Sequence, residues 1–370
     1  MIRFKIDVTF INREKEMAEL RNYLEGRPNA ILFLYGPKSS GKTTLMYRLF
    51  EQMEAEKRYG INFLNLRKIF LTSYDDFIDA FFKSSNSERG LKTGTRRQYS
   101  LFGFFKLDAF TERMLKKHQE DPFLVMEREF QSLAKKGIQP VIIIDEFHKL
   151  DGLYLPDKQK RLMVELMNFF VAMTKESHLC HVIIASSDAF FIEQVYVDSK
   201  LRKTSEFMKL DYLEKEDAFV WLRDIKKYNQ IQAYTLDEKQ IEIIWKTVGG
   251  SAWEIHYILG KLFQYPLDAV ISKIKREKVT MIADWAFDDA ARNSLLRYFR
   301  KQPIRKLTEL AGTNKNILGQ AVKDNILYYD PVDGIYGIQG KSLEWGIEGY
   351  FEETDIFFAE MDRENQDDPV

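Results

Sequence analysis

The sequence predicts a three-layer α/β fold for residues 1–212, in which a parallel sheet lies between two layers of helices. Two observations lead to this prediction. Continuous apolar runs of strand length, of which residues 31–35 and 141–144 are the clearest, indicate strands buried on both faces. Helical stretches alternate with these runs, and parallel strands need crossover connections of that kind.

The expected elements follow one another in a regular order. Residues 12–25 combine a cap residue with apolar side chains at helical spacing, so they predict an amphipathic helix. The strand at 31–35 ends at Gly36 and Pro37, and a helix is expected from 43 to 57. Beyond these, we expect strands at 61–66, 141–145, 181–186 and 207–210, and helices at 75–82, 122–136 and 158–175.

The strand-like runs stop after residue 212, which indicates a change of domain. Residues 213–283 predict a small helical domain. Residues 284–350 predict short helices followed by a hairpin at Asp333-Gly334, an arrangement that suggests a winged helix-turn-helix. The acidic tail, residues 351–370, is expected to be loosely ordered.

The composition limits the class of protein. With 55 basic and 56 acidic side chains, the formal net charge is −1, so no overall field draws the chain to nucleic acid or membrane. Its single cysteine, Cys180, cannot form an internal disulfide, and no apolar run approaches the ~18–20 residues of a membrane span. No secretory signal is seen, so we expect a cytoplasmic protein. The polar stretch 84–105 is expected to be an exposed excursion.

A glycine-bracketed loop stands between the 31–35 strand and the next helix, and this context favours a phosphate-binding P-loop over a turn without a ligand. Two glycines would let the backbone aim N–H groups at phosphate oxygens, with the positive end of the helix behind them. Lys42 would reach the β- and γ-phosphates, and Thr43 would offer its hydroxyl to Mg²⁺. The predicted ATP-binding residues here are Gly36, Pro37, Lys38, Ser39, Ser40, Gly41, Lys42, Thr43 and Thr44.

Two carboxylates follow the apolar run 141–144. Asp145 and Glu146 would stand at the carboxyl edge of the sheet, where open α/β sheets bind their ligands. Asp145 would hold Mg²⁺, and Glu146 would act as the general base that activates the attacking water. Glu146 therefore predicts hydrolysis of ATP as well as binding. The alternative is a buried strand that simply ends in a charged loop.

Two further side chains are candidates for contact with the γ-phosphate. Ser187 follows the 181–186 strand, which is expected beside the strand of Asp145, and its hydroxyl could hold the attacking water. Arg202 precedes the last strand and could stabilise charge that develops during phosphoryl transfer, within the chain or across a subunit contact. Turn formation by Ser187 and an exposed loop position for Arg202 are the alternatives.

Together these motifs resemble the archaeal ATPase family, a branch of the AAA+ class close to the signal-transducing switch ATPases. The resemblance implies an AAA+ sheet order, a helical lid over residues 213–283 and a C-terminal winged helix. The lid motif, residues 249–253, departs from the family's Gly-x-Pro-like pattern because it contains no proline. Residues that carry the resemblance are Phe10, Ile11 and Arg13 as an adenine-side motif, Asp145-Glu146-Phe147-His148, Ser186-Ser187, Arg202 and Leu213-Glu214.

Two functions agree with these features. The first is an AAA+-type ATPase that binds and hydrolyses Mg-ATP and whose nucleotide state controls the winged-helix module. The second is a DNA-binding regulator in which ATP is a structural or switch ligand with little turnover. Besides ATP and ADP, we expect DNA, a protein partner or a second copy of the chain as binding partners, and no membrane. The basic residues available for a DNA-binding face are Arg292, Arg297, Arg300, Lys301, Arg305, Lys306, Lys315 and Lys323.

Overall fold

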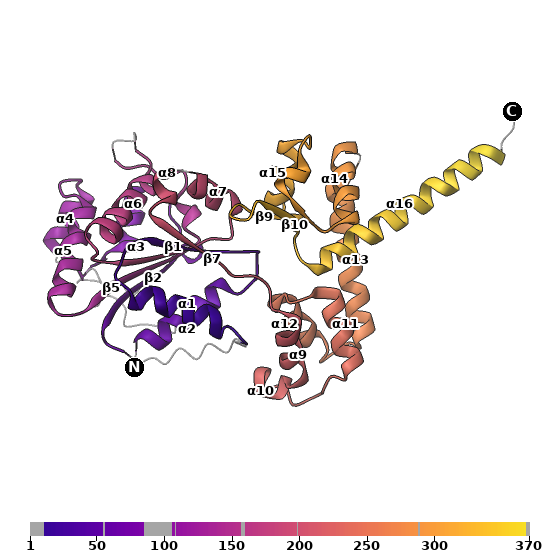
Figure 1. Cartoon of the computed structure of the whole chain (residues 1–370), viewed down its shortest axis with the longest axis horizontal. Helices are drawn as coiled ribbons and strands as arrows, with labels where there is room; N and C mark the ends of the chain where they lie inside the picture. Colours follow the sequence, from indigo (N-terminus) through magenta and orange to yellow (C-terminus); the bar gives the residue numbers. More distant parts are fainter. Residues whose placement is uncertain are drawn as a thin grey trace. The chain divides into compact units, whose positions relative to one another are not determined.

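The chain divides into two compact units in the computed structural model (Figure 1). The first unit comprises Arg13–Gly36 and Lys42–Leu210. The second contains Ile11 and Asn12, the loop Pro37–Gly41 and the chain from Asp211 onward. The structure describes residues 11–54, 56–84, 106–107, 109–156, 160–197, 199–287 and 289–367.

The first unit is built on a five-stranded parallel sheet with the order β2-β5-β6-β1-β7. All four strand pairings are parallel, so the connections between paired strands cross over the sheet. Helices α1 and α2 lie on one face, and α6 and α7 lie on the other (Figure 1). The predicted parallel α/β sheet is therefore confirmed. The strands are β1 (Ile31–Tyr35), β2 (Tyr59–Asn65), β5 (Gln139–Asp145), β6 (His181–Ala185) and β7 (Ser205–Lys209).

The helices of the first unit form mainly where the sequence predicts them. The predicted 158–175 helix begins only at Leu162, because Tyr154 and Arg161 instead form a β-bridge. A short parallel pair, β3 (Lys83–Ser84) and β4 (Lys106–Leu107), flanks the polar stretch, of which residues 85–105 lie outside the described residues. The helices and turns are α1 (Glu14–Glu25), α2 (Lys42–Glu54), η1 (Leu66–Lys68), α3 (Tyr74–Phe81), α4 (Ala109–Lys116), α5 (Pro122–Lys135), η3 (Phe147–Leu150), α6 (Leu162–Val171), the π-helical η4 (Ala172–Glu176), α7 (Ala189–Val197) and α8 (Ser199–Arg202).

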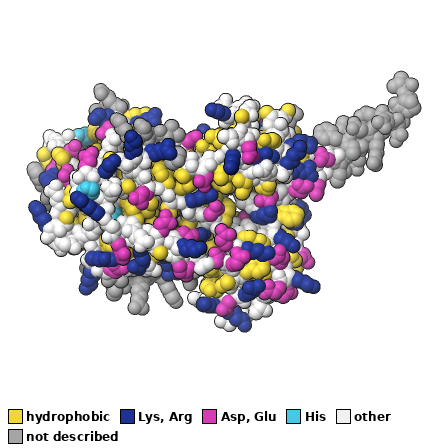
Figure 2. Space-filling model, viewed as in Figure 1, with side chains coloured by type: hydrophobic (Ala, Val, Ile, Leu, Met, Phe, Trp, Pro, Cys, Tyr) yellow, Lys and Arg dark blue, Asp and Glu magenta, His cyan; other side chains and the backbone are white. Residues whose placement is uncertain are grey.

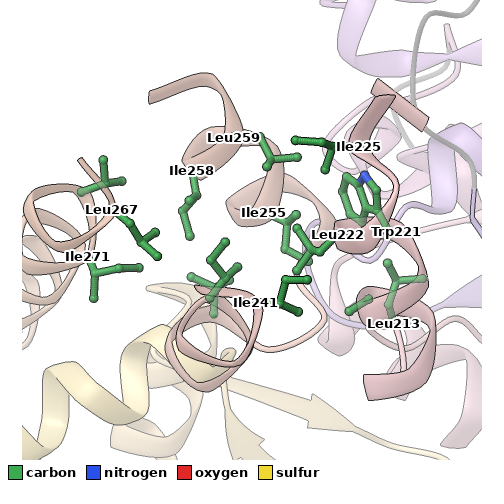
Figure 3. Packing of buried hydrophobic residues seen from close by; sticks show 14 of the residues in the cluster. Leu213, Trp221, Leu222, Ile225, Ile241, Ile255, Ile258, Leu259, Leu267 and Ile271 are labelled. Atoms are coloured by element: carbon green, nitrogen blue, oxygen red, sulfur yellow. The ribbon is translucent and has the colours of Figure 1, made fainter. Parts of the chain in front are cut away.

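Five helices in the second unit enclose a hydrophobic core, which includes Trp221, Ile255 and Ile258 (Figure 3). Burying each large apolar side chain contributes about 1.5–3 kcal/mol, so this core stabilises the helices without any sheet. Ile11, which the motif predicts on the adenine side of the nucleotide, belongs to this core. The helices are α9 (Lys215–Arg223), α10 (Ile225–Asn229), α11 (Glu238–Val248), α12 (Ala252–Lys261) and α13 (Leu267–Ala286).

Residues 289–350, called the C-terminal module below, combine helices with a three-stranded antiparallel sheet of order β8-β10-β9. The hairpin predicted at Asp333-Gly334 is present, and Gly334 has a φ of +64° that favours glycine. Strand β8, which the sequence analysis did not anticipate, pairs with the second strand of the hairpin. The elements are α14 (Ala290–Lys301), β8 (Ile304–Lys306), η5 (Leu307–Leu310), α15 (Lys315–Lys323), β9 (Leu327–Asp330), β10 (Ile335–Ile338) and the start of α16 (Lys341–Asp367).

Helix α16 continues through residues 351–367, where the acidic composition predicts a loosely ordered tail. Up to Asp355, side chains of α16 contact α14. Phe351 is buried, and Arg300 forms ion pairs with Glu348 at 2.6 Å and with Asp355 at 3.4 Å. These tertiary contacts explain why the acidic segment is helical as far as Asp355. No helix in the described part of the chain, α16 included, has the length and apolar character that a bilayer span requires.

Candidate nucleotide-binding site

The loop between β1 and α2 turns sharply at its two glycines. Gly36 has a φ of +142°, and a Cβ at this position would lie 2.1 Å from the carbonyl oxygen of Leu210, so only glycine fits. Gly41 has a φ of +99°, a conformation that side chains rarely adopt. Between them, the Ser40 N–H donates to the Pro37 carbonyl at 3.3 Å. The loop is thus a tight turn, as its spacing predicts.

Lys42 is the first residue of α2, and its ammonium is held close to the loop. Its Nζ donates to the Gly36 carbonyl at 2.9 Å, and the residue is only 6% exposed. A buried ammonium is costly unless hydrogen bonds satisfy it, so this contact fixes the side chain at the start of the helix. Thr44 follows in the first turn of α2 and is partly buried.

Thr43 and Asp145, the predicted metal-binding pair, contact each other directly. The Thr43 hydroxyl donates to Asp145 Oδ2 at 2.8 Å, and Asn65 Nδ2 donates to the same oxygen at 2.9 Å. Asp145 is 1% exposed; this burial raises the pKa of its carboxyl, and the hydrogen bond from Thr43 opposes the rise. A buried carboxylate beside a hydroxyl is an oxygen donor set that suits Mg²⁺.

Glu146 lies one residue further on and has three polar neighbours. Its carboxylate forms an ion pair with Arg67, lies 3.3 Å from His148 Nε2 and accepts from the Ser187 hydroxyl at 3.3 Å. The side chain is buried, although the Arg67 side chain is half exposed. Glu146 also has a left-handed φ of +63°, a conformation that costs a non-glycine residue free energy.

The register of the sheet explains this convergence. Asp145 stands opposite Asn65 of β2 on one side and opposite Ala185 of β6 on the other. Because the carboxyl ends of parallel strands meet at one edge, residues that follow these three strands are brought together. Asn65 and Arg67 belong to this cluster but are not predicted from the sequence. Asn65 is a polar residue at the end of a predicted buried strand, and that position was the available signal. It indicates a role only once the register places Asn65 opposite Asp145.

His148 lies between Ser186 and Glu146 and contacts both. Its Nδ1 lies 3.1 Å from the Ser186 hydroxyl, and its Nε2 faces Glu146. Burial lowers the pKa of His148, while the nearby Glu146 opposes the effect. A neutral imidazole can donate from one ring nitrogen and accept at the other, so His148 can bridge a hydroxyl and a carboxylate.

The remaining predicted residues are placed as follows. Arg202 is exposed at the end of α8, just before β7. Arg13 forms an ion pair with Glu16 at 2.6 Å. Lys38 and Ser39 are exposed on the loop. Phe10 lies outside the described residues. The structure thus brings Thr43, Asp145, Glu146 and Ser187 together in one cluster.

The fold and this cluster can be compared with known proteins. Residues 10–258 match the model of an ATPase domain found predominantly in Archaea. The chain belongs to this archaeal ATPase family. The resemblance drawn from the motifs is thereby confirmed, and the parallel sheet agrees with membership of the AAA+/P-loop class.

Relatives align with this chain along almost their whole length. Two ATP-binding proteins of Methanocaldococcus jannaschii are 31% identical over 349 and 336 residues. The first alignment covers 88% of this chain and 93% of the relative, and the second covers 88% and 91%. Both relatives therefore align with the archaeal ATPase domain and with most of the chain beyond it.

Solved structures resemble the fold at lower identity. The Walker-type ATPase of Pyrococcus abyssi has a TM-score of 0.60 at 15% identity, covering 92% of this chain and 96% of that one. The ORC2 protein of Aeropyrum pernix, in its ADPNP and ADP complexes, has a TM-score of 0.50 at 11% identity, covering 95% and 97%. At these identities the likeness establishes the fold alone.

Proposed function

We propose that this chain is an Mg-ATP-binding and Mg-ATP-hydrolysing ATPase. The observation that carries the proposal is the convergence of Thr43, Asp145 and Glu146 beside the start of α2, whose first residue is Lys42. A site that only bound nucleotide would need the loop, the lysine and the metal ligands. The buried Glu146 with three polar partners is the additional feature that hydrolysis requires.

Thr43 and Asp145 would hold the metal ion. Asn65 would fix the orientation of the Asp145 carboxylate through its hydrogen bond to Oδ2. Mg²⁺ would supply charge neutralisation at the β- and γ-phosphate oxygens. Asp145 is buried, and a nearby cation favours its ionised form, so metal binding would offset the desolvation that burial imposes. Lys42 would add a positive charge at the γ-phosphate once it leaves the Gly36 carbonyl.

Glu146 would act as the general base. It would take a proton from the attacking water as the water oxygen bonds to the γ-phosphorus and the bond to the ADP oxygen breaks. Arg67, His148 and Ser187 would hold its carboxylate in position through the contacts described above. Arg202 stays a candidate for stabilising the transferred phosphoryl group, within its own chain or from a second copy.

Two substitutions test this assignment. Lys42→Ala should abolish ATP binding, because the loop loses its ammonium. Glu146→Gln should retain ATP and lower the turnover rate by roughly 10²–10⁴-fold, the usual contribution of general-base catalysis. Lys135→Ala and Glu19→Gln, on exposed helix positions, are the controls and should match wild type. If both site variants turn over ATP like wild type, the site is wrongly assigned.

The C-terminal module would be the element that the nucleotide controls. Its order of helix, strand, short helix, α15 and hairpin is the arrangement that we interpret as a winged helix-turn-helix, with α13 as the last helix of the preceding lid. Lid and module belong to one compact unit, which also includes the loop Pro37–Gly41. A change in the loop on nucleotide binding could therefore alter the module without a separate transmitting domain.

A second candidate function, DNA binding with little turnover, is favoured by one observation. Lys315 and Lys323 are exposed at the two ends of α15, the helix that would enter a major groove. Basic and acidic side chains are otherwise interspersed over the face shown in Figure 2. With the full-length chain, replacing both lysines by alanine should reduce the slope of log K against log salt by about 2. Absence of salt-dependent duplex binding by wild type would remove this candidate.

A further inference from the structure

Tyr212 contacts both the phosphate loop and the C-terminal module. Its hydroxyl donates to the Lys38 carbonyl at 3.1 Å, and Gln339 Nε2 donates to the same hydroxyl at 3.2 Å. Lys38 belongs to the loop segment Pro37–Gly41, which lies in the same compact unit as Tyr212 and Gln339. One side chain thus joins two segments that the sequence separates by about 300 residues.

The backbone next to Tyr212 is held in place by Gly250. The N–H of Leu213 donates to the Gly250 carbonyl at 3.1 Å. A Cβ on Gly250 would lie 1.9 Å from the Leu213 carbonyl oxygen, so only glycine allows this approach. This contact gives a physical reason for one glycine of the 249–253 motif, which has no proline. Its role is to dock the chain that carries Tyr212.

The segment that carries Gln339 is anchored from the other side. Ser342, at the start of α16, donates to Glu254 Oε1 at 2.6 Å, and Lys278 Nζ lies 3.3 Å from the same oxygen. Glu254 is 8% exposed, and a buried carboxylate with two partners holds its neighbours firmly. Gly340 lies between Gln339 and Ser342 in the chain and has a φ of +90°. A Cβ on Gly340 would lie 3.6 Å from the Tyr212 hydroxyl.

The arrangement fixes the orientation of one peptide in the loop. A tyrosine hydroxyl has one proton to donate and can accept as well, so accepting from Gln339 strengthens its donation to Lys38. The peptide unit is planar and trans, so the Lys38 carbonyl and the Ser39 N–H point in opposite directions. Holding that oxygen therefore sets the direction of the Ser39 N–H, one of the loop amides expected to face the phosphates.

We propose that Tyr212 is a positioning residue that couples nucleotide binding to the C-terminal module through the chain of hydrogen bonds Lys38–Tyr212–Gln339. The proposal rests on the nucleotide site proposed above. Coupling of this kind is reciprocal: if the segment around Gln339 moves, affinity for nucleotide changes, and nucleotide binding shifts that segment by the same free energy. The regulated step is thus the ordering of the phosphate loop itself.

A double-mutant cycle tests the coupling. Binding of a fluorescent ADP analogue with Mg²⁺ is measured for wild type, Tyr212→Phe, Gln339→Ala and the double variant. Loss of one hydrogen bond should weaken binding by about 3- to 10-fold in Tyr212→Phe. Gln339→Ala should also weaken binding, but it should have no effect once the hydroxyl is absent, so the effects are not additive. Tyr265→Phe, on an exposed tyrosine of the same unit, should bind like wild type.

Amide hydrogen exchange provides a second readout that a purely structural tyrosine would not change. Nucleotide should slow exchange across residues 335–342 in wild type and have no effect there in Tyr212→Phe. Additive effects in the double-mutant cycle would overturn the proposal. So would an unchanged exchange rate of residues 335–342 when wild type binds nucleotide, and this measurement remains decisive even if Tyr212→Phe fails to fold. If wild type binds the nucleotide no better than Lys42→Ala does, the proposed function fails instead.

Discussion

His181 should make the first unit sensitive to acid. The side chain is 1% exposed at the start of β6, and its ring packs edge-on against Tyr23 with centroids 5.1 Å apart. Burial lowers the pKa of His181 to about 4, compared with 6.5 for an exposed histidine. The unfolded chain therefore binds a proton more readily than the folded chain between these two values. Stability from this group is complete above pH 6.5 and is lost as the pH falls toward 4.

The size of the effect follows from the pKa difference. Each unit corresponds to about 1.4 kcal/mol, so the full shift contributes about 3 kcal/mol to the free energy of unfolding. Replacing His181 by Phe keeps an aromatic ring beside Tyr23 and removes the titrating group. The variant should lose less stability than wild type between pH 7 and 4.5, whereas His118→Asn, at an exposed position, should follow wild type.

Urea denaturation followed by far-UV circular dichroism is the suitable assay. The 5 tryptophans all lie beyond residue 220 and would report on the second unit. The quantity to compare is the difference in unfolding free energy between wild type and His181→Phe at each pH. All other titratable groups are the same in both proteins, so their effect on stability cancels in this difference. Parallel curves across the whole range would refute the reasoning.

Three further substitutions follow from close contacts. Gly250→Ala should lower the Tm of the second unit, followed by tryptophan fluorescence, because its Cβ would meet a backbone carbonyl at 1.9 Å; Gly260→Ala, with open space in a helix, should raise the Tm. An unchanged Tm for the first would contradict the packing. Phe351→Ala should cost about 3–5 kcal/mol in denaturant unfolding, whereas Phe287→Ala, 82% exposed, should stay within about 0.5 kcal/mol, and equal losses would argue against a docked α16. Asn65→Ala should raise the Mg²⁺ concentration needed for half-maximal ATPase activity by about 10- to 100-fold, and an unchanged Mg²⁺ dependence would exclude its support of the metal ligand.

The features that sequence can predict are those whose cause is local. An apolar run such as residues 141–144 has to be buried wherever it occurs, and the glycines at 36 and 41 are required by backbone conformations within the loop itself. Hence the strands and the turn follow from short stretches of the chain. The family resemblance rests on the same short segments.

Features that depend on contacts between distant segments do not follow from such stretches. Asn65 and Arg67 reach Asp145 and Glu146 only because β2 pairs with β5 in one register, and no pattern within β2 encodes that register. Composition gives the wrong expectation for residues 351–355, because acidic side chains are usually solvated, whereas Asp355 pairs with arginines of α14. Tertiary contacts override local tendencies in such cases.

The same effect changes what the basic residues of the C-terminal module can do. Counted in sequence, eight of them could face DNA, but Arg297 and Arg300 pair with acidic residues of α16, and Arg305 donates to the Tyr298 carbonyl. Arginines used in this way hold the module together. Arg297 is exposed but already pairs with Asp355, and the other exposed cations among the eight are lysines at 301, 306, 315 and 323. If all four contacted phosphates, the slope of log K against log salt would be about −3.6. A steeper measured slope would mean that α16 releases its arginines on binding, which would make the helix a regulator of the DNA-binding face.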